Sequence, residues 1–179
     1  DDTGAISCWG GVHPDAIANV PTGSFASLSA GGTATCALDG EGLISCWGNN
    51  EHHQVSETPT ENGYSSVSAG GGHNCAIDPP DGIVCWGNDS EDQVSKAPST
   101  GAGWVGAVSA GARHNCALDT LGYVGCWGEN GDGQISGAPS RAGYAAVSAG
   151  AYHSCALDEA GGAYCWGSDK GLSGGDAGQ

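Results

Sequence analysis

Residues 148–167 read SAGAYHSCALDEAGGAYCWG, and variants of this stretch recur along the chain. The tripeptide Ser-Ala-Gly begins at Ser29, Ser68, Ser109 and Ser148. The tripeptide Cys-Trp-Gly begins at Cys8, Cys46, Cys85, Cys126 and Cys165, at intervals of 38, 39, 41 and 39 residues. A period near 40 residues indicates a repeat architecture, in which each unit buries its apolar face against its neighbours.

The apolar pattern within one unit predicts three short strands. In the last unit these strands cover residues 144–149, 153–157 and 163–167. Asp and Gly dominate the segment between the second and third strands, as is typical of tight turns. The 34 glycines of the chain disfavour long helices, because glycine weakens a helix interior. The sequence therefore predicts an all-β fold of propeller blades or solenoid turns.

The repeat also predicts the domain organisation. We expect a single repeat domain over residues 1–179, with a partial blade at 1–24 and repeats at about 25–63, 64–103, 104–143 and 144–179. Cys8 occupies the third-strand position of its unit, so we expect the chain to start in the middle of a hairpin. Three explanations stay open: a fragment of a longer array, completion of the blade by another chain or an incoming strand, or a free Cys8.

The remaining eight cysteines form pairs of identical spacing: Cys36 with Cys46, Cys75 with Cys85, Cys116 with Cys126, and Cys155 with Cys165. Each pair is centred on a predicted turn, so regular antiparallel pairing places its members opposite each other, near the separation that a disulfide needs. The sequence therefore predicts disulfides and a secreted or cell-surface protein. Reduced core cysteines are an alternative, and a zinc site is disfavoured because no C-x-x-C motif occurs.

The charge of the chain excludes several classes of partner. Twenty acidic residues face four basic ones, giving a formal net charge of -16. Such a polyanion repels nucleic-acid phosphates and anionic membranes. The sequence also has no apolar run of the roughly 18 residues that a membrane-spanning helix needs. The charge serves solubility, or it attracts a basic partner or cations.

The unit Ser-Ala-Gly-x-x-His-x-Cys-Ala-Leu-Asp, followed by Cys-Trp-Gly-x-Asn-x-x-Gly-Gln, resembles the repeat of the regulator of chromosome condensation family. The likeness extends from residue 7 to about 170 and is strongest at 148–167 and 128–134. It implies a β-propeller, usually of seven blades, and the secreted, disulfide-bearing members are closest in character. Four repeats and a partial one imply an incomplete or inter-chain-completed propeller. The absence of a basic surface argues against the chromatin activities of the founding member.

Residues that recur at one position of the repeat are expected to be structural, because repetition favours packing over recognition. They are Trp9, Trp47, Trp86, Trp127, Trp166, His73, His114 and His153. The tryptophan recurs at every Cys-Trp-Gly, and the histidine in all full repeats but the first, which has Ala34. A further aromatic position precedes each Ser-Ala-Gly strand and serves either as core between blades or as a platform for sugars. Its residues are Phe25, Tyr64, Trp104 and Tyr144.

Residues that vary between units are better candidates for binding. We expect the binding loops to contain His52, His53, Asp89, Glu91, Asp92, Glu129 and Asp132. Their clustered carboxylates are the ligands that calcium prefers, although no EF-hand spacing is present. We expect no cofactor, with calcium as the open alternative.

The evidence for an enzyme is weak. Residues 171–175 match the G-x-S-x-G motif, but they lack the strand and helix that this motif needs around its serine. The sequence favours a secreted, non-catalytic propeller module that binds a protein or assembles with itself through the incomplete N-terminal blade. The alternatives are a lectin-like carbohydrate-binding module and a calcium-dependent surface protein. No nucleic acid and no membrane insertion are expected.

Overall fold

The computed structural model of the chain describes residues 5–10, 17, 19–79, 82–98, 103–104 and 106–168. Within these residues every regular element is a β-strand. The strands are β1 Phe25–Ala30, β2 Ala34–Asp39, β3 Ile44–Gly48, β4 Ser66–Ala69, β5 His73–Asp78, β6 Gly82–Gly87, β7 Ala107–Ala110, β8 His114–Leu118, β9 Val124–Gly128, β10 Tyr144–Ala149, β11 His153–Asp158 and β12 Ala163–Gly167. No described helix could cross a membrane.

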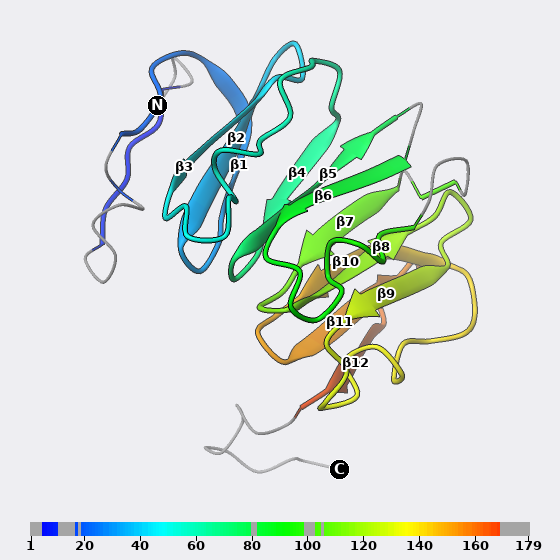
Figure 1. Cartoon of the computed structure of the whole chain (residues 1–179). Helices are drawn as coiled ribbons and strands as arrows, with labels where there is room; N and C mark the ends of the chain where they lie inside the picture. Colours follow the sequence, from blue (N-terminus) through cyan, green and yellow to red (C-terminus); the bar gives the residue numbers. More distant parts are fainter. Residues whose placement is uncertain are drawn as a thin grey trace.

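Consecutive strands form four antiparallel sheets of three strands each, β1–β3, β4–β6, β7–β9 and β10–β12. Figure 1 shows these sheets side by side along an arc, in the manner of propeller blades. The arc is open, with the first and last sheets at its two ends. Each sheet falls within one predicted repeat, and the predicted all-β blade fold is confirmed. The strands of the last unit differ from the prediction by one residue, at the end of β11.

A disulfide joins the middle and outer strands of every blade. The bonds are Cys36–Cys46, Cys75–Cys85, Cys116–Cys126 and Cys155–Cys165. In each case the two cysteines are direct partners in the strand register. Closing a loop of this size stabilises a fold by about 2–3 kcal/mol in the chain-entropy model. Cys8 is a free cysteine.

The core lies in the joints, by which we mean the three interfaces between consecutive blades. In the first joint, Leu38 of the first blade packs in one cluster with Val67 and Trp86 of the second. The equivalent trio in the second joint is Ile77, Val108 and Trp127. The third joint buries Leu118 with Tyr144 and Trp166. A blade of three strands cannot bury both of its own faces, so each blade depends on its neighbours for its core.

The Ser-Ala-Gly tripeptides connect the inner strands of neighbouring blades. The Ser29 hydroxyl accepts a hydrogen bond from the amide of Ala69 at 3.0 Å. Equivalent bonds join Ser68 to Ala110 at 3.0 Å and Ser109 to Ala149 at 2.9 Å. The glycine that follows lets the backbones approach closely. A β-carbon on Gly70 would lie 2.6 Å from the Gly111 carbonyl oxygen and 2.7 Å from His73 Cε1.

The substitution Gly70→Ala is therefore expected to destabilise the protein by about 2 kcal/mol or more, because the new methyl group overpacks the second joint. For a chain of this length the melting temperature should fall by several degrees. Gly40→Ala is the matched control, since a β-carbon there meets no atom within 4 Å. Thermal unfolding followed by circular dichroism compares the two variants, and equal melting temperatures would contradict this account of the joint.

Candidate functional site

Three turns of common design follow the outer strands of the first three blades. We call residues 49–54, 88–93 and 129–134 the turn segments. They follow β3, β6 and β9, whereas the turns that connect middle and outer strands lie at the opposite end of each blade. In Figure 1 the turn segments can be traced from the ends of these three arrows.

A buried glutamine holds each turn segment against the next blade. The side chains of Gln54, Gln93 and Gln134 are almost completely buried. The main-chain carbonyl of Gln54 accepts hydrogen bonds from Trp86 Nε1 at 3.0 Å and from Asn74 Nδ2 at 2.8 Å, while its side-chain amide bonds Asn49 within the turn segment. Gln93 receives the same pair of bonds from Trp127 and Asn115, and Gln134 receives one from Trp166. The turn segments are therefore fixed to the neighbouring blade by buried polar contacts.

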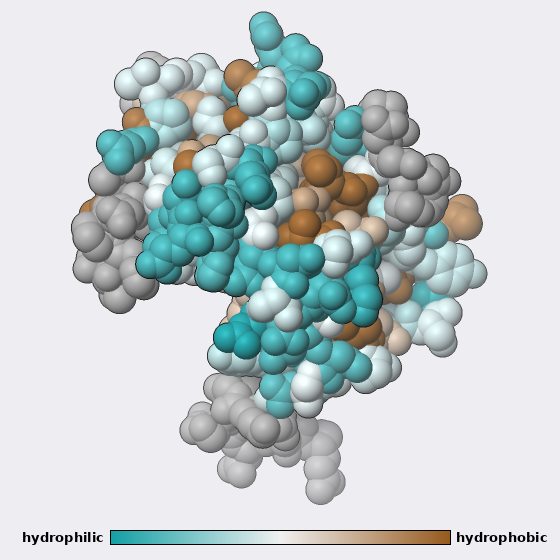
Figure 2. Space-filling view, in the orientation of Figure 1, coloured by the Kyte–Doolittle hydropathy of each residue, from teal (hydrophilic) through white to brown (hydrophobic). Residues whose placement is uncertain are grey.

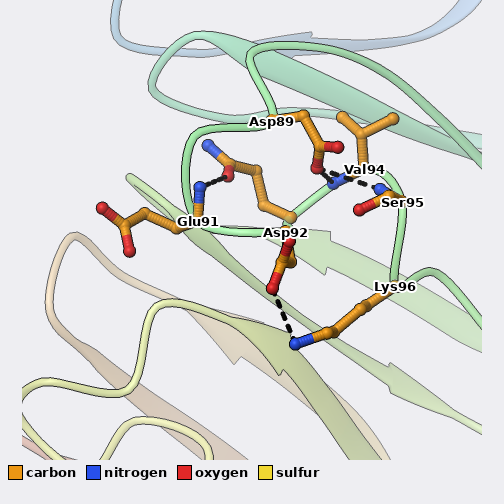
Figure 3. A network of polar contacts seen from close by, with 7 residues as sticks. Asp89, Glu91, Asp92, Val94, Ser95 and Lys96 are labelled. Carbon is orange, nitrogen blue, oxygen red and sulfur yellow. Dashed lines mark hydrogen bonds and ion pairs between the residues drawn. The ribbon is translucent and has the colours of Figure 1, made fainter.

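A second set of hydrogen bonds closes each turn segment from within. The Asp89 carboxylate accepts the amides of Val94 and Ser95 at 2.8 and 2.9 Å, as Figure 3 shows. Desolvation raises the pKa of the Asp89 carboxyl group, but the amides of Ser95 and Val94, together with the Ser95 hydroxyl and His73, outweigh it and keep this pKa below its usual value. Asn50 and Asn130 make the corresponding bonds in the other turn segments. Asp89 is thus a structural residue of its turn.

The calcium hypothesis gains no support from this arrangement. One carboxylate oxygen of Asp89 already serves two amides, and Asp92 lies 2.6 Å from the ammonium group of Lys96. In the described residues no group of three or more His, Cys, Asp or Glu side chains converges as metal ligands would. The expectation that no cofactor is needed stays a prediction.

The residues between the fixed points of the turn segments differ from blade to blade. They are Glu51-His52-His53 in the first, Ser90-Glu91-Asp92 in the second and Gly131-Asp132-Gly133 in the third. The last residue of each trio has a left-handed backbone, with φ of 63°, 59° and 80°. His53 and Asp92 therefore keep a conformation that favours glycine, so one backbone carries three different sets of side chains.

The first two turn segments border a shared hollow. Its volume is about 290 Å³, and its lining includes Glu51, His52, Asn88 and Arg113. The cations nearby lie beside acids, with Arg113 3.9 Å from Glu91 and Lys96 beside Asp92. Figure 3 shows the carboxylate of Glu91 directed away from its turn. We call the surface made by the turn segments and this hollow the turn face; Figure 2 shows a hydrophilic surface over this part of the molecule.

The recurrent histidines connect one blade to the next. His73 and His114 are fully buried, and their Nε2 atoms lie 2.8 Å from Asn115 Oδ1 and Ser154 Oγ, respectively. Neither Nδ1 atom has a hydrogen-bond partner in the described structure. Burial, with the neighbouring imidazoles of His73 and His153, lowers the pKa of His114 to about 4. Burial likewise lowers the pKa of His73, against the opposing effects of Asn115 and Asp89. His153, in the last blade, is exposed.

The recurrent tryptophans divide into two groups. Trp47, Trp86, Trp127 and Trp166 are 3–8% exposed, but Trp9 is 86% exposed. The expectation of a structural role for Trp9 stays a prediction, since in this structure its ring is exposed. Residues 5–10 form no strand, and no described carbonyl binds its indole as Gln54 binds that of Trp86. The aromatic positions Tyr64 and Tyr144 are buried in the joints, so these two rings cannot stack on a sugar.

The sequence reasoning missed the polar residues that fix the turn face. The three buried glutamines recur eight residues after a Cys-Trp-Gly cysteine, which was a visible signal for their role. Asn74, Asn115 and Ser154 share one position beside the recurrent histidines. The candidate catalytic motif at residues 171–175 lies outside the described residues.

Comparisons with known proteins agree with this architecture. A model of the regulator of chromosome condensation (RCC1) repeat matches residues 25–54, 107–134 and 144–170. No curated protein sequence matches the chain. The chain is 26% identical to the ectodomain of receptor kinase CR4 from Physcomitrella patens, with a TM-score of 0.69 over 81% of this chain and 39% of that one.

Two further solved structures are similar. The ectodomain of receptor kinase ACR4 from Arabidopsis thaliana is 29% identical, with a TM-score of 0.64 over 81% of this chain and 51% of that one. Yeast RCC1 (Prp20), solved bound to Kap60, is 19% identical, with a TM-score of 0.66 over 82% of this chain and 45% of that one, which shows likeness of fold alone. The chain thus spans between 39% and 51% of the length of these proteins.

Glu129 interrupts the frame of the third turn segment. In the first two, Asn49 and Asn88 accept a bond from the buried glutamine amide at 2.9 and 3.0 Å. Glu129 holds the equivalent position, and within the described structure its Oε2 and Gln134 Nε2 are buried without partners. We expect Glu129→Asn to restore the bond and raise the free energy of unfolding by about 1 kcal/mol. Chemical denaturation measures this change in the free energy of unfolding. The reverse exchange, Asn88→Glu, should lower the free energy of unfolding by at least as much. An increase for Asn88→Glu would contradict the role given to the asparagine.

The buried histidines predict acid sensitivity. His114 has a pKa of about 4 in the folded chain and about 6.5 when unfolded, so protons bind the unfolded state preferentially between these values. The contribution of His114 to the free energy of unfolding is complete above pH 6.5 and is lost as the pH falls toward 4. The free energy then falls by up to about 1.4 kcal/mol per pH unit. Urea denaturation measures the free energy of unfolding at pH 7 and at pH 5. Between these two pH values it should fall less for His114→Gln than for the native chain or for His52→Gln, an exposed control. Equal losses would exclude this role.

Proposed function

Because this chain belongs to the regulator of chromosome condensation repeat family, we propose that it is a protein-binding β-propeller module. The match to the family repeat in three blades supports the scaffold. The similar structures include two receptor-kinase ectodomains and a yeast RCC1 solved with a protein partner. Since the chain covers about half or less of each of these proteins, their partners are not assigned to it.

The turn face is the proposed binding surface. The observation that carries this proposal is that three turn segments share one buried frame and display different side chains on it. Binding residues commonly lie on loops positioned by a rigid scaffold, because an ordered loop loses little conformational entropy on binding. The glutamine and asparagine bonds supply that rigidity, and residues such as Glu51, His52 and Glu91 supply the variation.

A partner with a basic surface fits this face best. The chain holds 20 acidic residues against four basic ones. Arg113 and Lys96, the cations near the turn face, lie beside Glu91 and Asp92 and do not change its acidic character. Opposite charge on the partner would accelerate association and suppress binding to acidic competitors.

The proposed setting is extracellular, and the proposed role is non-catalytic. Four disulfides suit an oxidising compartment, and receptor ectodomains are among the similar structures. Beside the turn face the Ser56 hydroxyl lies 3.5 Å from His53 Nδ1, but both side chains are exposed to solvent, where a serine is a weak nucleophile. We propose that binding requires neither a metal ion nor a cofactor.

Selection of a displayed random-peptide library against the immobilised chain tests the proposal. We expect enrichment of Lys- and Arg-containing peptides whose affinity falls as salt is raised, because salt screens the attraction between opposite charges. The double variant Glu51→Lys/Glu91→Lys should weaken binding of these peptides by about tenfold or more, since it reverses two charges on the turn face.

The matched control reverses two acids at the opposite end of the blades. Glu41→Lys/Glu159→Lys changes the net charge by the same amount, and both residues are exposed in turns between middle and outer strands. Peptide affinity should fall much less in this control. Equal losses in the two double variants would show that only net charge matters, and that result would overturn the turn face as the binding site.

A further inference from the structure

The hollow of the turn face is the place of a side chain that the second blade lacks. We propose that this hollow receives one arginine side chain of the partner, and that Gly72 keeps it open. The site rests on the proposed function, because it names the residue through which a basic partner is anchored. All residues that line the hollow belong to the first three blades, so it is framed on both sides within the chain.

One position of the repeat decides whether this place is filled. It is the residue directly before each middle strand. Its main-chain carbonyl accepts a hydrogen bond, 2.8–2.9 Å long, from the amide directly after the outer strand of the same blade. The four residues at this position are Thr33, Gly72, Arg113 and Tyr152. Of these, Gly72 alone has no side chain, so the backbone of the second blade is the same while the space above it stays empty of protein atoms.

Arg113 shows which group this position can carry. Its guanidinium lies 3.9 Å from the carboxylate of Glu91, in the turn segment of the preceding blade. His52 holds the equivalent place beside Gly72, since both His52 and Glu91 stand two residues before a buried glutamine. A β-carbon on Gly72 would lie 3.3 Å from His52 Cδ2 and 3.6 Å from Asn88 Cβ. A side chain there would therefore enter the space between the first two turn segments, which is the hollow.

The size and the lining of the hollow fit a guanidinium group. Its volume of about 290 Å³ corresponds to roughly ten water molecules, which suits one long side chain. Glu51 lines it, and within the described residues the Glu51 carboxylate forms no ion pair. The Ser90 hydroxyl offers an acceptor from the second turn segment, and the imidazole of His52 offers a flat ring. A planar guanidinium can bond such acceptors and stack on such a ring, whereas a lysine ammonium cannot stack in this way.

The charge around the hollow favours a cation over an anion. The first two turn segments contain four carboxylates, and Lys96 and Arg113 lie beside them, so four negative and two positive charges leave a formal net charge of -2. Arg113 also lines the hollow, but its charge is offset by Glu91. An arginine of the partner would meet Glu51 much as Arg113 meets Glu91 within the chain.

An NMR titration of the isotopically labelled full chain with the blocked tripeptide acetyl-Gly-Arg-Gly-amide tests the site. We expect saturable shifts of the amide signals of His52, Gly72 and Ser90. The matched ligand carries citrulline, which has nearly the shape of arginine without its charge, and it should bind roughly tenfold more weakly because its hydrogen bonds are not charge-assisted. Shifts confined to other residues, equal binding of the citrulline peptide, or tighter binding of a glutamate tripeptide would overturn the arginine site.

The variant Gly72→Arg fills the hollow from within, as Arg113 does in the third blade. It should fold, because Gly72 has no left-handed backbone and the nearest atom to the new β-carbon belongs to the exposed ring of His52. We expect the selected arginine peptides to bind this variant roughly tenfold or more weakly, since they lose the pocket of their anchor residue. Gly40→Arg is the matched control. It adds the same charge in the turn between β2 and β3, where a β-carbon meets no atom within 4 Å, and it should bind nearly as well as the native chain.

Failure of the arginine site and failure of the turn face give different results. If Gly72→Arg binds the peptides as tightly as the native chain while Glu51→Lys/Glu91→Lys does not, the peptides use the turn face outside the hollow, and the arginine site alone is overturned. Equal losses in Gly72→Arg and Gly40→Arg would overturn it as well, because only net charge would then matter. A selection that enriches no basic peptides would overturn the proposed function itself. Melting temperatures show that both glycine variants are folded.

Discussion

The structure depends on the joint between consecutive blades. A three-stranded sheet exposes two faces, and only a neighbouring sheet can remove both from water. In the joints, one aliphatic residue of a middle strand meets an inner strand, while the following tryptophan donates its indole N–H to a glutamine carbonyl of the preceding turn segment. Apolar burial and a satisfied polar contact thus occur in the same interface. A buried indole without that carbonyl would lose a hydrogen bond that water would otherwise provide.

The parts of the fold that the sequence predicts are those governed by local chemistry. Alternation of apolar residues and Asp-Gly turns gives the strands of the last unit to within one residue, and the spacing of Cys155 and Cys165 gives their register. The recurrence of Gln54 marks it as part of the repeat, but its partner could not be derived in this way, because its main-chain carbonyl binds Trp86, which is 32 residues away. The burial of Trp9 could not be derived from the repeat either, since recurrence in sequence does not ensure that a neighbouring blade covers the ring.

The turn face can vary because only some of its residues hold the turn through their side chains. Residues whose atoms hold the frame, such as Gln93 and Asp89, have little freedom to change. The residues between them contribute mainly backbone amides to that frame, as Glu91 does by donating its N–H to Gln93 Oε1 at 2.7 Å. Any residue other than proline offers the same main-chain amide. His53 and Asp92 show how far this tolerance extends, because they occupy a left-handed position without altering the turn.

Binding and stability are therefore coupled through the joints. Each glutamine that anchors a turn segment is bonded through its main-chain carbonyl to the tryptophan of the next blade. In the second and third joints a buried histidine also attaches that blade, as His73 is attached to Asn115. Asn115 connects the histidine to the turn segment, since its side-chain nitrogen also donates to the main-chain carbonyl of Gln93. Opening the second or the third joint would release a turn segment and a histidine together. A face built in this way keeps its shape only while neighbouring blades remain packed, so the geometry offered to a partner is a property of the whole array.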